Sequence, residues 1–223
     1  MPSAPSNFDR RNRLRNSNLG KFVKQHSANV SLLFFLGFPS YKGASTSYIQ
    51  RLVNWESDLY SDLVQTDFTD SYLNIRLKAQ AMLRWASIYC YNATYVIRSD
   101  DDVSFDVTTV VDILQRTGEM YGEDFDFILG DVKTSLDWRT VIRLERDKNN
   151  VPYDVYPEEY WPPFALGGLL GYPLRTVRLL YEASLREKAI EGIDDVYITG
   201  ICAPRVNVTL VGDRLWRFRH KSY

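Results

Sequence analysis

Apolar residues fall into continuous runs and helically spaced stretches along the first 90 residues of the chain. The run from residue 30 to residue 36 stops at Gly37-Phe38-Pro39, which is typical of a buried strand followed by a turn. Residues 45–60 carry apolar side chains at Ile49, Leu52, Val53 and Trp55 with polar residues between them, and this spacing predicts a first helix. A stronger helix is predicted after a cap at Asp67 or Thr69, with apolar side chains at Leu73, Leu77, Ala81, Trp85 and Ile88.

The pattern then continues with further strands and helices. Residues 95–97 and 125–129 predict strands on either side of a helix over 107–115, and residues 173–188 predict another helix. Residues 165–172 are apolar and glycine-rich, so the backbone there can approach a ligand closely. Strands that alternate with helices favour an α/β fold with one mixed, helix-flanked sheet in a single domain, and such sheets bind ligands at the carboxyl ends of strands.

Residues 131–164 have a different character, with charges and prolines among aromatic residues. They predict long connecting loops and a hairpin between residues 138–144 and 151–155, with turn-forming residues at 147–150. Long aromatic loops over the ligand edge of a sheet often form lids, and a surface hairpin without a function is the alternative.

The composition indicates a folded chain with almost no net charge. The 223 residues are 45% hydrophobic, which excludes disorder. Lys and Arg number 27 against 28 Asp and Glu, so the charge gives no reason to expect a nucleic-acid partner. The sequence has no run of about eighteen apolar residues, and residues 1–5 lack the apolar core of a signal peptide, so we expect a soluble chain.

Residues 1–29 form a basic amino-terminal segment ahead of the domain expected over residues 30–223. Its charges suit a solvated arm, a phosphate contact or a membrane-proximal stretch, of which the solvated arm is the simplest. The cations are Arg10, Arg11, Arg13, Arg15, Lys21 and Lys24.

Two cysteines and three glycosylation sequons bear on the compartment. Cys90 and Cys202 are too few for a disulfide framework and are either buried thiols or one bridge. The sequons begin at Asn29, Asn92 and Asn207 and favour a secretory compartment.

Three consecutive aspartates, Asp100, Asp101 and Asp102, follow the apolar run 95–97. Carboxylates gathered at the end of a buried strand repel one another and are stabilised by a hard divalent cation. Such a cation commonly completes its shell with substrate phosphates, so the pattern suggests a phosphorylated ligand held through a metal. A solvated acidic turn is the alternative.

A second acidic pair, Asp194 and Asp195, opens the last predicted helix. Carboxylates at a helix amino terminus commonly act as caps, because unsatisfied amides lie there. A carboxylate near a metal-bound electrophile can also act as a general base for an attacking hydroxyl.

Four blocks of residues, in order along the chain, resemble motifs of the β-1,3-galactosyltransferase family. Residues 55–74 with Lys78 resemble the block "E…YxD…DFxDxYxNLTxK", and residues 98–102 resemble "KxDDD". Residues 156–168 are similar to "YP…YPPYxxGxGY", and residues 194–197 to "EDVY", although the next glycine, Gly200, stands one residue late.

The resemblance implies a GT-A fold, with a Rossmann-like sheet that binds a UDP-sugar through Mn2+ and transfers the sugar with inversion. It implies that Asp102 ligates Mn2+, that Asp100 lies near the ribose, and that Asp195, beside Asp194, deprotonates the acceptor. Asp101 would serve the donor sugar or be structural, and His220 would be a metal ligand or a surface residue. Further donor-binding residues would be Arg15, Lys78, Arg98, Gly167 and Gly168. Arg15 and Lys78 are also compatible with a solvated and a snorkelling side chain, respectively.

We therefore expect an inverting hexosyltransferase that forms a β-1,3 linkage from UDP-galactose to a glycan on protein or lipid. UDP-N-acetylglucosamine is the alternative donor, and a non-catalytic secretory chaperone or glycan-binding relative is the alternative class. The resemblance also implies a type II Golgi membrane protein facing the lumen, although this sequence contains no anchor.

Overall fold

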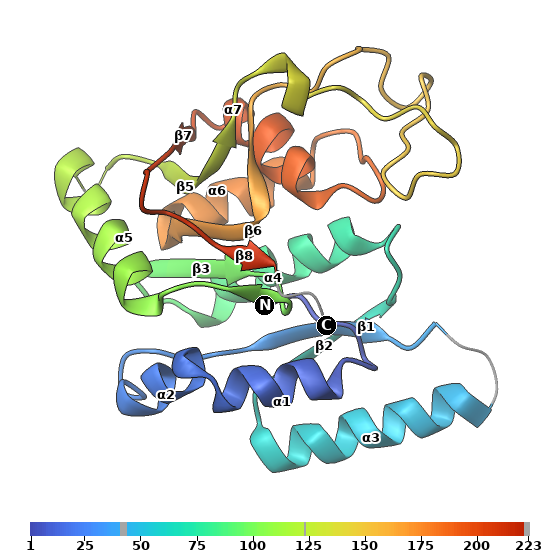
Figure 1. Ribbon diagram of the computed structural model, residues 1–223, viewed down its shortest axis with the longest axis vertical. Coiled ribbons are helices and arrows are strands. Elements are labelled where there is room, and N and C mark those ends of the chain that lie inside the picture. Colours follow the sequence, from blue (N-terminus) through green and yellow to red (C-terminus); the bar gives the residue numbers. More distant parts are fainter. Residues whose placement is uncertain (41–43, 123, 221–223) are drawn as a thin grey trace.

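The computed structural model describes residues 1–40, 44–122 and 124–220, which form one mixed α/β unit (Figure 1). In chain order, its elements are α1 (Phe8–Asn16), α2 (Asn18–Gln25), β1 (Phe34–Phe38), α3 (Ala44–Tyr60), β2 (Leu63–Thr69), α4 (Ile75–Tyr89), β3 (Tyr95–Ser99), β4 (Val103–Ser104), α5 (Val107–Tyr121), β5 (Phe127–Lys133), a 3-10 turn η1 (Leu136–Trp138), β6 (Phe164–Pro173), α6 (Leu174–Ser184), a π-helical turn η2 (Val196–Cys202), α7 (Ala203–Arg205), β7 (Thr209–Val211) and β8 (Arg219–His220).

The strands form three groups of mixed direction. β1 and β2 pair in parallel across the α3 crossover, as expected for a Rossmann-like unit. The main sheet has the order β3-β6-β5-β7, in which β6 is antiparallel to β3 and β5, and β7 is parallel to β5. The short strands β4 and β8 pair with each other. The predicted α/β fold with a mixed sheet and flanking helices is confirmed, and the arrangement is consistent with a GT-A-like fold.

β6 is one of the two inner strands of the main sheet, whose two faces carry the two hydrophobic cores. It is apolar along almost its whole length because helices cover both faces of the main sheet. The larger core lies between the sheet and α4, α6 and η2, with Val177 and Leu180 fully buried. The smaller core lies under α5, where Ile113 and Leu114 pack on Phe127 of β5. The two cores fix the position of the strand ends that carry the acidic residues.

The structure corrects the sequence analysis around residues 63–75. Residues 63–69 form β2, an edge strand that we did not predict, and α4 begins only at Ile75. The buried face of α4 contains Lys78, Ala79, Leu83 and Ala86. Of the predicted apolar positions, Leu73 precedes the helix and is 58% exposed, and Ile88 is 49% exposed because the core lies on another side of α4.

Other helix boundaries also differ from the expected ones. α5 continues to Tyr121 rather than residue 115, and α6 ends at Ser184 rather than residue 188, leaving Leu185 exposed. The last predicted helix is the wide turn η2. Gly200 lies inside this turn against Phe164 and Pro162, where an added Cβ would lie 3.2 Å from each of them.

The amino-terminal segment is part of the fold and not a solvated arm. Residues 1–3 run parallel to β1, with Ser3 donating its N–H to the Phe35 carbonyl at 3.0 Å. Arg11 and Arg15 of α1 are buried, whereas Arg13, Lys21 and Lys24 are exposed. The expectation of a solvated arm is therefore wrong for the residues that pack against β1.

The hairpin predicted between residues 138–144 and 151–155 lies in a loop with little pairing. One isolated bridge joins Thr140 to Tyr160, and the Val151 N–H reaches the Ile142 carbonyl at 2.9 Å. The predicted turn is present, since the Asn150 N–H donates to the Asp147 carbonyl at 3.0 Å. Trp161 of the same region is buried in the larger core and anchors the loop.

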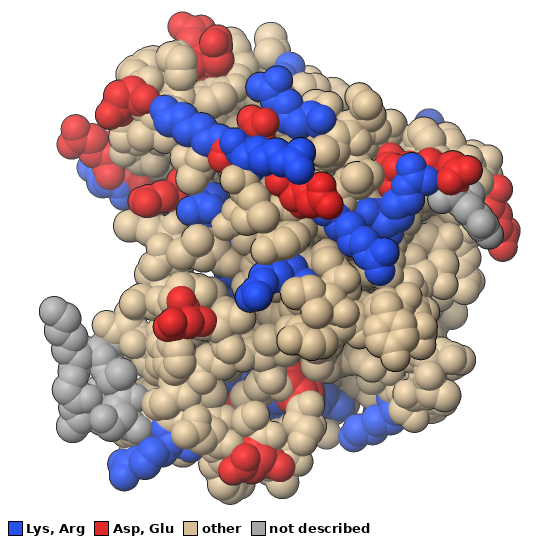
Figure 2. Space-filling model, turned by 180° about the vertical axis from the view of Figure 1, so that it is seen from behind, with Lys and Arg blue, Asp and Glu red and all other residues tan. Residues whose placement is uncertain are grey.

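The face seen from behind carries basic and acidic side chains side by side, with wide uncharged areas between them (Figure 2). Among the residues that the structure describes, no helix is long and apolar enough to cross a membrane. Cys90 and Cys202 are free thiols, so the structure contains no bridge between them. The sequon residues Asn29, Asn92 and Asn207 are all exposed.

Candidate active site

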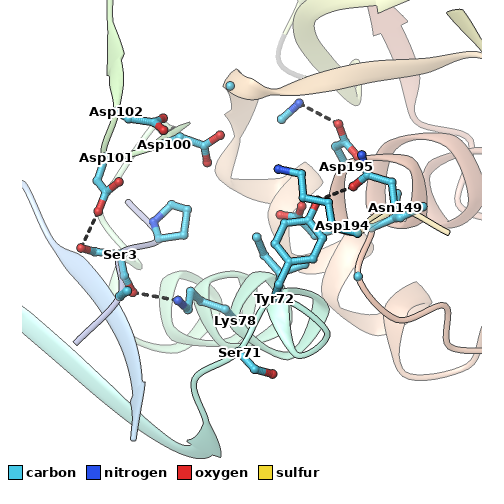
Figure 3. Close-up of a pocket in the computed structure, with 18 of the residues that line it drawn as sticks. Ser3, Ser71, Tyr72, Lys78, Asp100, Asp101, Asp102, Asn149, Asp194 and Asp195 are labelled. Carbon is cyan, nitrogen blue, oxygen red and sulfur yellow. Dashed lines mark hydrogen bonds between the residues drawn. The ribbon is translucent and has the colours of Figure 1, made fainter. Parts of the chain in front are cut away.

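Both acidic clusters line one open cleft of about 830 Å³ at the carboxyl end of β3. Figure 3 shows the aspartates after β3 on one side and Asp194 and Asp195 on the other. Of the residues singled out from the sequence, those that line the cleft are Lys78, Arg98, Asp100, Asp101, Asp102, Gly167, Gly168, Asp194, Asp195 and His220.

The three consecutive aspartates have different surroundings. Asp101 is buried and accepts hydrogen bonds from Ser3 Oγ (2.7 Å), Asn7 Nδ2 (2.9 Å) and Arg10 Nη1 (3.0 Å). It therefore fastens the amino-terminal segment to the end of β3, which favours the structural alternative for this residue. Asp102 keeps a third of its side chain exposed and lies 3.3 Å from Arg10 Nη1.

The pairing of β4 with β8 brings His220 to the triplet. Val103 lies opposite His220 in this ladder, and His220 Nδ1 is 3.7 Å from Asp102 Oδ1. A carboxylate and an imidazole are suitable ligands for Mn2+. The described residues contain no group of three or more His, Cys, Asp or Glu side chains able to hold a metal. A cation held by this pair would need its remaining ligands from substrate oxygens and water.

Arg98 of β3 connects the two acidic clusters. Its Nη2 lies 2.9 Å from Asp100 Oδ1 and 2.9 Å from Asp194 Oδ2. The carboxylates around the buried guanidinium raise its pKa against the effect of burial. For Asp100 the effect of burial is the reverse: burial raises the pKa of this carboxyl group, and the positive charge of Arg98 opposes that rise. Nη1 of Arg98 is buried and has no hydrogen-bond partner among the described residues, so this cleft residue retains an unused donor.

Asp195 is fixed by the backbone on both sides. It caps η2 by accepting from the Val196 N–H (2.8 Å), and its other oxygen accepts from the Gly167 N–H of β6 (3.2 Å). Thr199 donates to the Asp195 carbonyl at 2.7 Å and accepts from the Ala165 N–H at 2.9 Å, which ties η2 to β6. Asp195 therefore caps the turn η2 and also lines the cleft, so the two roles considered for it do not exclude each other.

The electrostatic surroundings of Asp195 suit a proton acceptor. Burial, followed by the charge of Asp194, raises the pKa of Asp195 to about 6, while the Val196 and Gly167 amides act in the opposite direction. A carboxylate with a pKa near 6 is ionised at neutral pH and is a stronger base than an ordinary aspartate.

The adjacent glycines make room for neighbouring side chains. A Cβ on Gly167 would lie 2.6 Å from Arg98 Nη1, and a Cβ on Gly168 would lie 2.3 Å from the Phe218 ring. Glycine at these positions therefore lets Arg98 and the carboxy-terminal segment approach β6. The glycines thus have a packing role, and the close approach of their backbone to a ligand stays a prediction.

Lys78 lies at the cleft with its charge already paired. Its Nζ donates to the Ser3 carbonyl (2.7 Å) and is 2.9 Å from the nearer oxygen of Asp70. It thus holds the amino-terminal segment from below the cleft and is buried rather than snorkelling.

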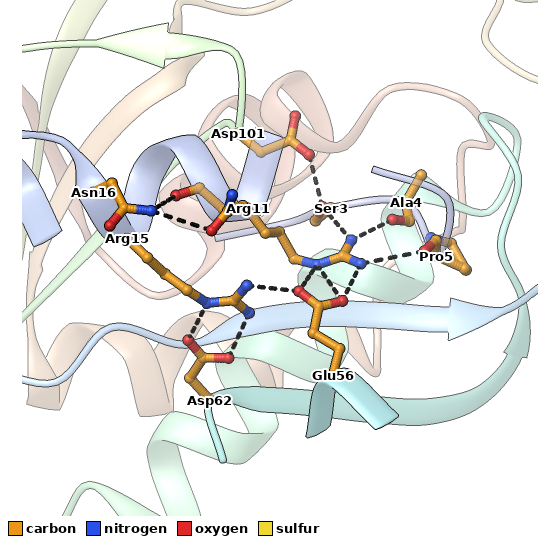
Figure 4. Close-up of polar contacts among 10 residues, drawn as sticks. Ser3, Ala4, Pro5, Arg11, Arg15, Asn16, Glu56, Asp62 and Asp101 are labelled. Carbon is orange, nitrogen blue, oxygen red and sulfur yellow. Dashed lines mark hydrogen bonds and ion pairs between the residues drawn. The ribbon is translucent and has the colours of Figure 1, made fainter. Parts of the chain in front are cut away.

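Arg15 is outside the set of described residues that line the cleft. Its guanidinium pairs with Asp62 and Glu56 at 2.7 Å, and Arg11 binds the other side of Glu56 at 2.6 Å (Figure 4). These contacts assign Arg15 to an internal ion-pair network. Arg10, five residues before Arg15 on α1, is instead a cation that lines the cleft.

Tyr72, Lys148 and Asn149 line the cleft and were given no individual role from the sequence, although the loop that carries Lys148 and Asn149 was considered as a lid over the ligand edge. The Tyr72 hydroxyl donates to Asn149 Oδ1, and Lys148 Nζ lies 4.9 Å from the centre of the Tyr72 ring. Burial, followed by the charges of Asp195 and Asp194, raises the pKa of Tyr72 to about 12. For Tyr72, the signal in the sequence was its position within the first family-like block.

A GT-A-like fold with an acidic triplet at a strand end and a carboxylate across the same cleft is the arrangement expected of a nucleotide-sugar glycosyltransferase. Residues 9–214 match the family model described as Galactosyltransferase. The chain belongs to this galactosyltransferase family.

Similar curated proteins are named as N-acetylglucosaminyltransferases. The chain is 31% identical to lactosylceramide 1,3-N-acetyl-beta-D-glucosaminyltransferase of Rattus norvegicus over 211 residues, covering 93% of this chain and 54% of the relative. It is 33% identical to UDP-GlcNAc:betaGal beta-1,3-N-acetylglucosaminyltransferase 7 of Mus musculus over 183 residues, covering 82% of this chain and 44% of the relative. The chain thus spans about half the length of these relatives.

Proposed function

We propose that the chain is the catalytic unit of an inverting, Mn2+-dependent β-1,3-glycosyltransferase that uses a UDP-sugar. The observation that carries the proposal is the presence of both acidic clusters in one cleft, with Asp102 beside His220 and Asp195 on the opposite side. Family membership and the names of the relatives support the same reaction class.

The donor half of the cleft would hold the nucleotide diphosphate. Asp102 and His220 would hold Mn2+, which when bound supplies positive charge to the departing diphosphate. Arg98 lines the same cleft, and its Nη1, buried beside Gly167, has no hydrogen-bond partner among the described residues. A donor of this kind costs free energy while it is unpaired, so a ligand oxygen that accepts from it is bound more tightly.

The acceptor half would activate the attacking hydroxyl. Asp195 would take the proton of that hydroxyl as its oxygen attacks the anomeric carbon from the face opposite the leaving diphosphate. Its two backbone hydrogen bonds hold the carboxylate in place without neutralising it. Retention of this second carboxylate distinguishes the proposal from a non-catalytic chaperone or glycan-binding relative, which needs no base.

The relatives favour the alternative donor over the one expected from the motifs. They are named as N-acetylglucosaminyltransferases, and one name specifies UDP-GlcNAc as donor and a β-galactoside as acceptor. We therefore place UDP-N-acetylglucosamine ahead of UDP-galactose, with a β-galactosyl-terminated glycan on protein or lipid as acceptor. A location in the Golgi lumen stays part of the proposal, because the sequon asparagines are exposed and could be glycosylated there.

A panel of UDP-sugars tests the proposal directly. Thermal stabilisation is measured for each sugar with Mn2+ and with EDTA, followed by UDP release without acceptor. We expect one UDP-sugar to stabilise the protein in Mn2+ only, and to release UDP slowly. Stabilisation without any UDP release or transfer would favour the non-catalytic alternative, and absence of metal-dependent stabilisation would contradict the proposal.

A further inference from the structure

A second cleft, of about 1230 Å³, adjoins the candidate active site. Its walls come from α2, the beginning of α5, the end of β5 and the carboxy-terminal segment from Trp216 to His220. The residues that line both clefts are Trp138, Leu166, Phe218 and His220. The two clefts are therefore adjacent parts of one larger depression.

The shared boundary contains His220, the proposed metal ligand, and through Leu166 also reaches the strand that holds the proposed base. Gly167, whose N–H binds Asp195, directly follows Leu166 on β6. A hydroxyl that reaches Asp195 thus belongs to a molecule beside the boundary residues, and the remainder of a long molecule can extend across them.

Trp138 presents an aromatic surface at this boundary. It ends the η1 turn, is 63% exposed, and has Lys133 Nζ 4.3 Å from its ring centre. The apolar C–H face of a pyranose ring packs well on an exposed indole, and sugar sites combine such rings with a few polar groups. Phe22 and Phe105 add further aromatic lining inside the second cleft.

The charge of the second cleft is opposite to that of the first. Its cations are Lys21, Lys133, Arg217 and Arg219. Asp131 pairs with Lys133 at 3.0 Å, which cancels one charge of each sign, and Asp106 caps α5 through two backbone N–H groups. Cations therefore still outnumber carboxylates in this cleft. An anionic ligand group is therefore favoured there, in contrast to the carboxylate-rich active site.

We infer that the second cleft binds the inner saccharides of an elongated acceptor, stacked on Trp138, with a sulfate or carboxylate substituent near Lys21 and Arg217. This inference rests on the proposed function for the position of the acceptor hydroxyl. It assigns the chain a preference for long, anionic oligosaccharides over short, neutral ones.

The first test measures binding without the reaction. Calorimetry is performed with N-acetyllactosamine disaccharide and hexasaccharide, the latter both neutral and sulfated, on the wild type, Trp138→Ala and Trp55→Ala. Trp55 is a matched control because it is also 63% exposed and is not among the described residues lining either cleft. We expect the sulfated hexasaccharide to bind most tightly, and Trp138→Ala alone to weaken it about tenfold, the upper end of an aromatic contact.

The second test separates charge from stacking. Lys21→Gln combined with Arg217→Gln is expected to remove the preference for the sulfated over the neutral hexasaccharide. Arg84→Gln combined with Arg186→Gln, which removes the same charge from exposed positions outside the second cleft, is expected to preserve it. Affinity independent of saccharide length, or equal effects of the two double variants, would overturn the inference.

UDP binding in Mn2+ is measured on the same proteins. A wild type that binds UDP in Mn2+ but binds the hexasaccharides no more tightly than the disaccharide would reject the second cleft alone. A wild type that binds the sulfated hexasaccharide but not UDP would instead reject the proposed function and leave the saccharide site standing.

Discussion

The two buried charge networks of this chain differ in balance. Around α1, two guanidiniums, Arg11 and Arg15, meet two carboxylates, Glu56 and Asp62, at 2.6 to 2.7 Å. In the cleft, the guanidinium of Arg98 contacts both Asp100 and Asp194 while one of its nitrogens lacks a partner among the described residues. The balanced network holds the fold together. The unbalanced one has more carboxylates than guanidiniums and leaves negative charge that a bound cation can neutralise.

The largest effect is expected at the proposed base. Asp195→Asn removes the proton acceptor with little change in volume, so sugar transfer should fall about 10²- to 10⁴-fold while UDP affinity in Mn2+ is retained. Steady-state rates and calorimetry measure the two quantities. Asp112→Asn on the exposed side of α5 is the matched control and should keep full transfer. Transfer that survives in Asp195→Asn would require another base.

A large loss of stability is expected in the balanced network. Glu56→Gln leaves Arg11 and Arg15 without their shared carboxylate, so the free energy of unfolding should fall by about 3–5 kcal/mol. Urea unfolding measures it. Glu182→Gln, which disrupts the exposed pair with Arg186, should cost no more than about 0.5 kcal/mol. Similar losses in both variants would contradict the contrast between buried and exposed charge.

A smaller loss is expected at the glycine beside the cleft. Gly168→Ala places a Cβ 2.3 Å from the Phe218 ring, so the free energy of unfolding should fall by about 1–3 kcal/mol through overpacking. Gly212→Ala is the control, because its Cβ would meet only ordinary contacts at 3.9 Å or more. If urea unfolding found Gly168→Ala as stable as the wild type, the packing role of this glycine would be rejected.

The smallest change is a shift in pH dependence. Because Asp195 must be ionised to act as a base, the transfer rate should rise with pH through the Asp195 pKa of about 6. Asp194→Asn removes a neighbouring negative charge, so the Asp195 pKa should fall and the rising limb should move to lower pH. The pH profile of kcat/KM measures this. A limb that stays in place would show that Asp194 does not tune the base.

Local patterns in the sequence predicted the parts of the fold that depend on continuous burial. β1, β3 with its following aspartates and α3 have runs or spacings that identify them. β6 was recognised only as an apolar, glycine-rich stretch and not as a strand. β2 was missed because the edge strand is half-buried and rich in polar residues. The buried face of α4 was misplaced because the buried charge of Lys78 is stabilised by the Ser3 carbonyl and by Asp70. Only the tertiary fold brings these groups close to Lys78.

The candidate site was predictable only as far as its motifs reach. The two acidic clusters and His220 were found and lie in one cleft, but Arg15 was expected at the donor and lies in the internal network. Its partners, Glu56 and Asp62, are 41 and 47 residues away along the chain, and no local pattern indicates such pairs. The contact between Tyr72 and Asn149 was hidden for the same reason.

The most direct measurement of the central claim is UDP binding to Asp102→Asn and Asp195→Asn, each titrated in Mn2+ and in EDTA. The account predicts that Asp102→Asn loses the Mn2+-dependent part of the affinity, whereas Asp195→Asn binds UDP as the wild type does. Full Mn2+-dependent binding by Asp102→Asn, or its loss in Asp195→Asn alone, would contradict the division of the cleft into a metal-held donor side and a proton-accepting side.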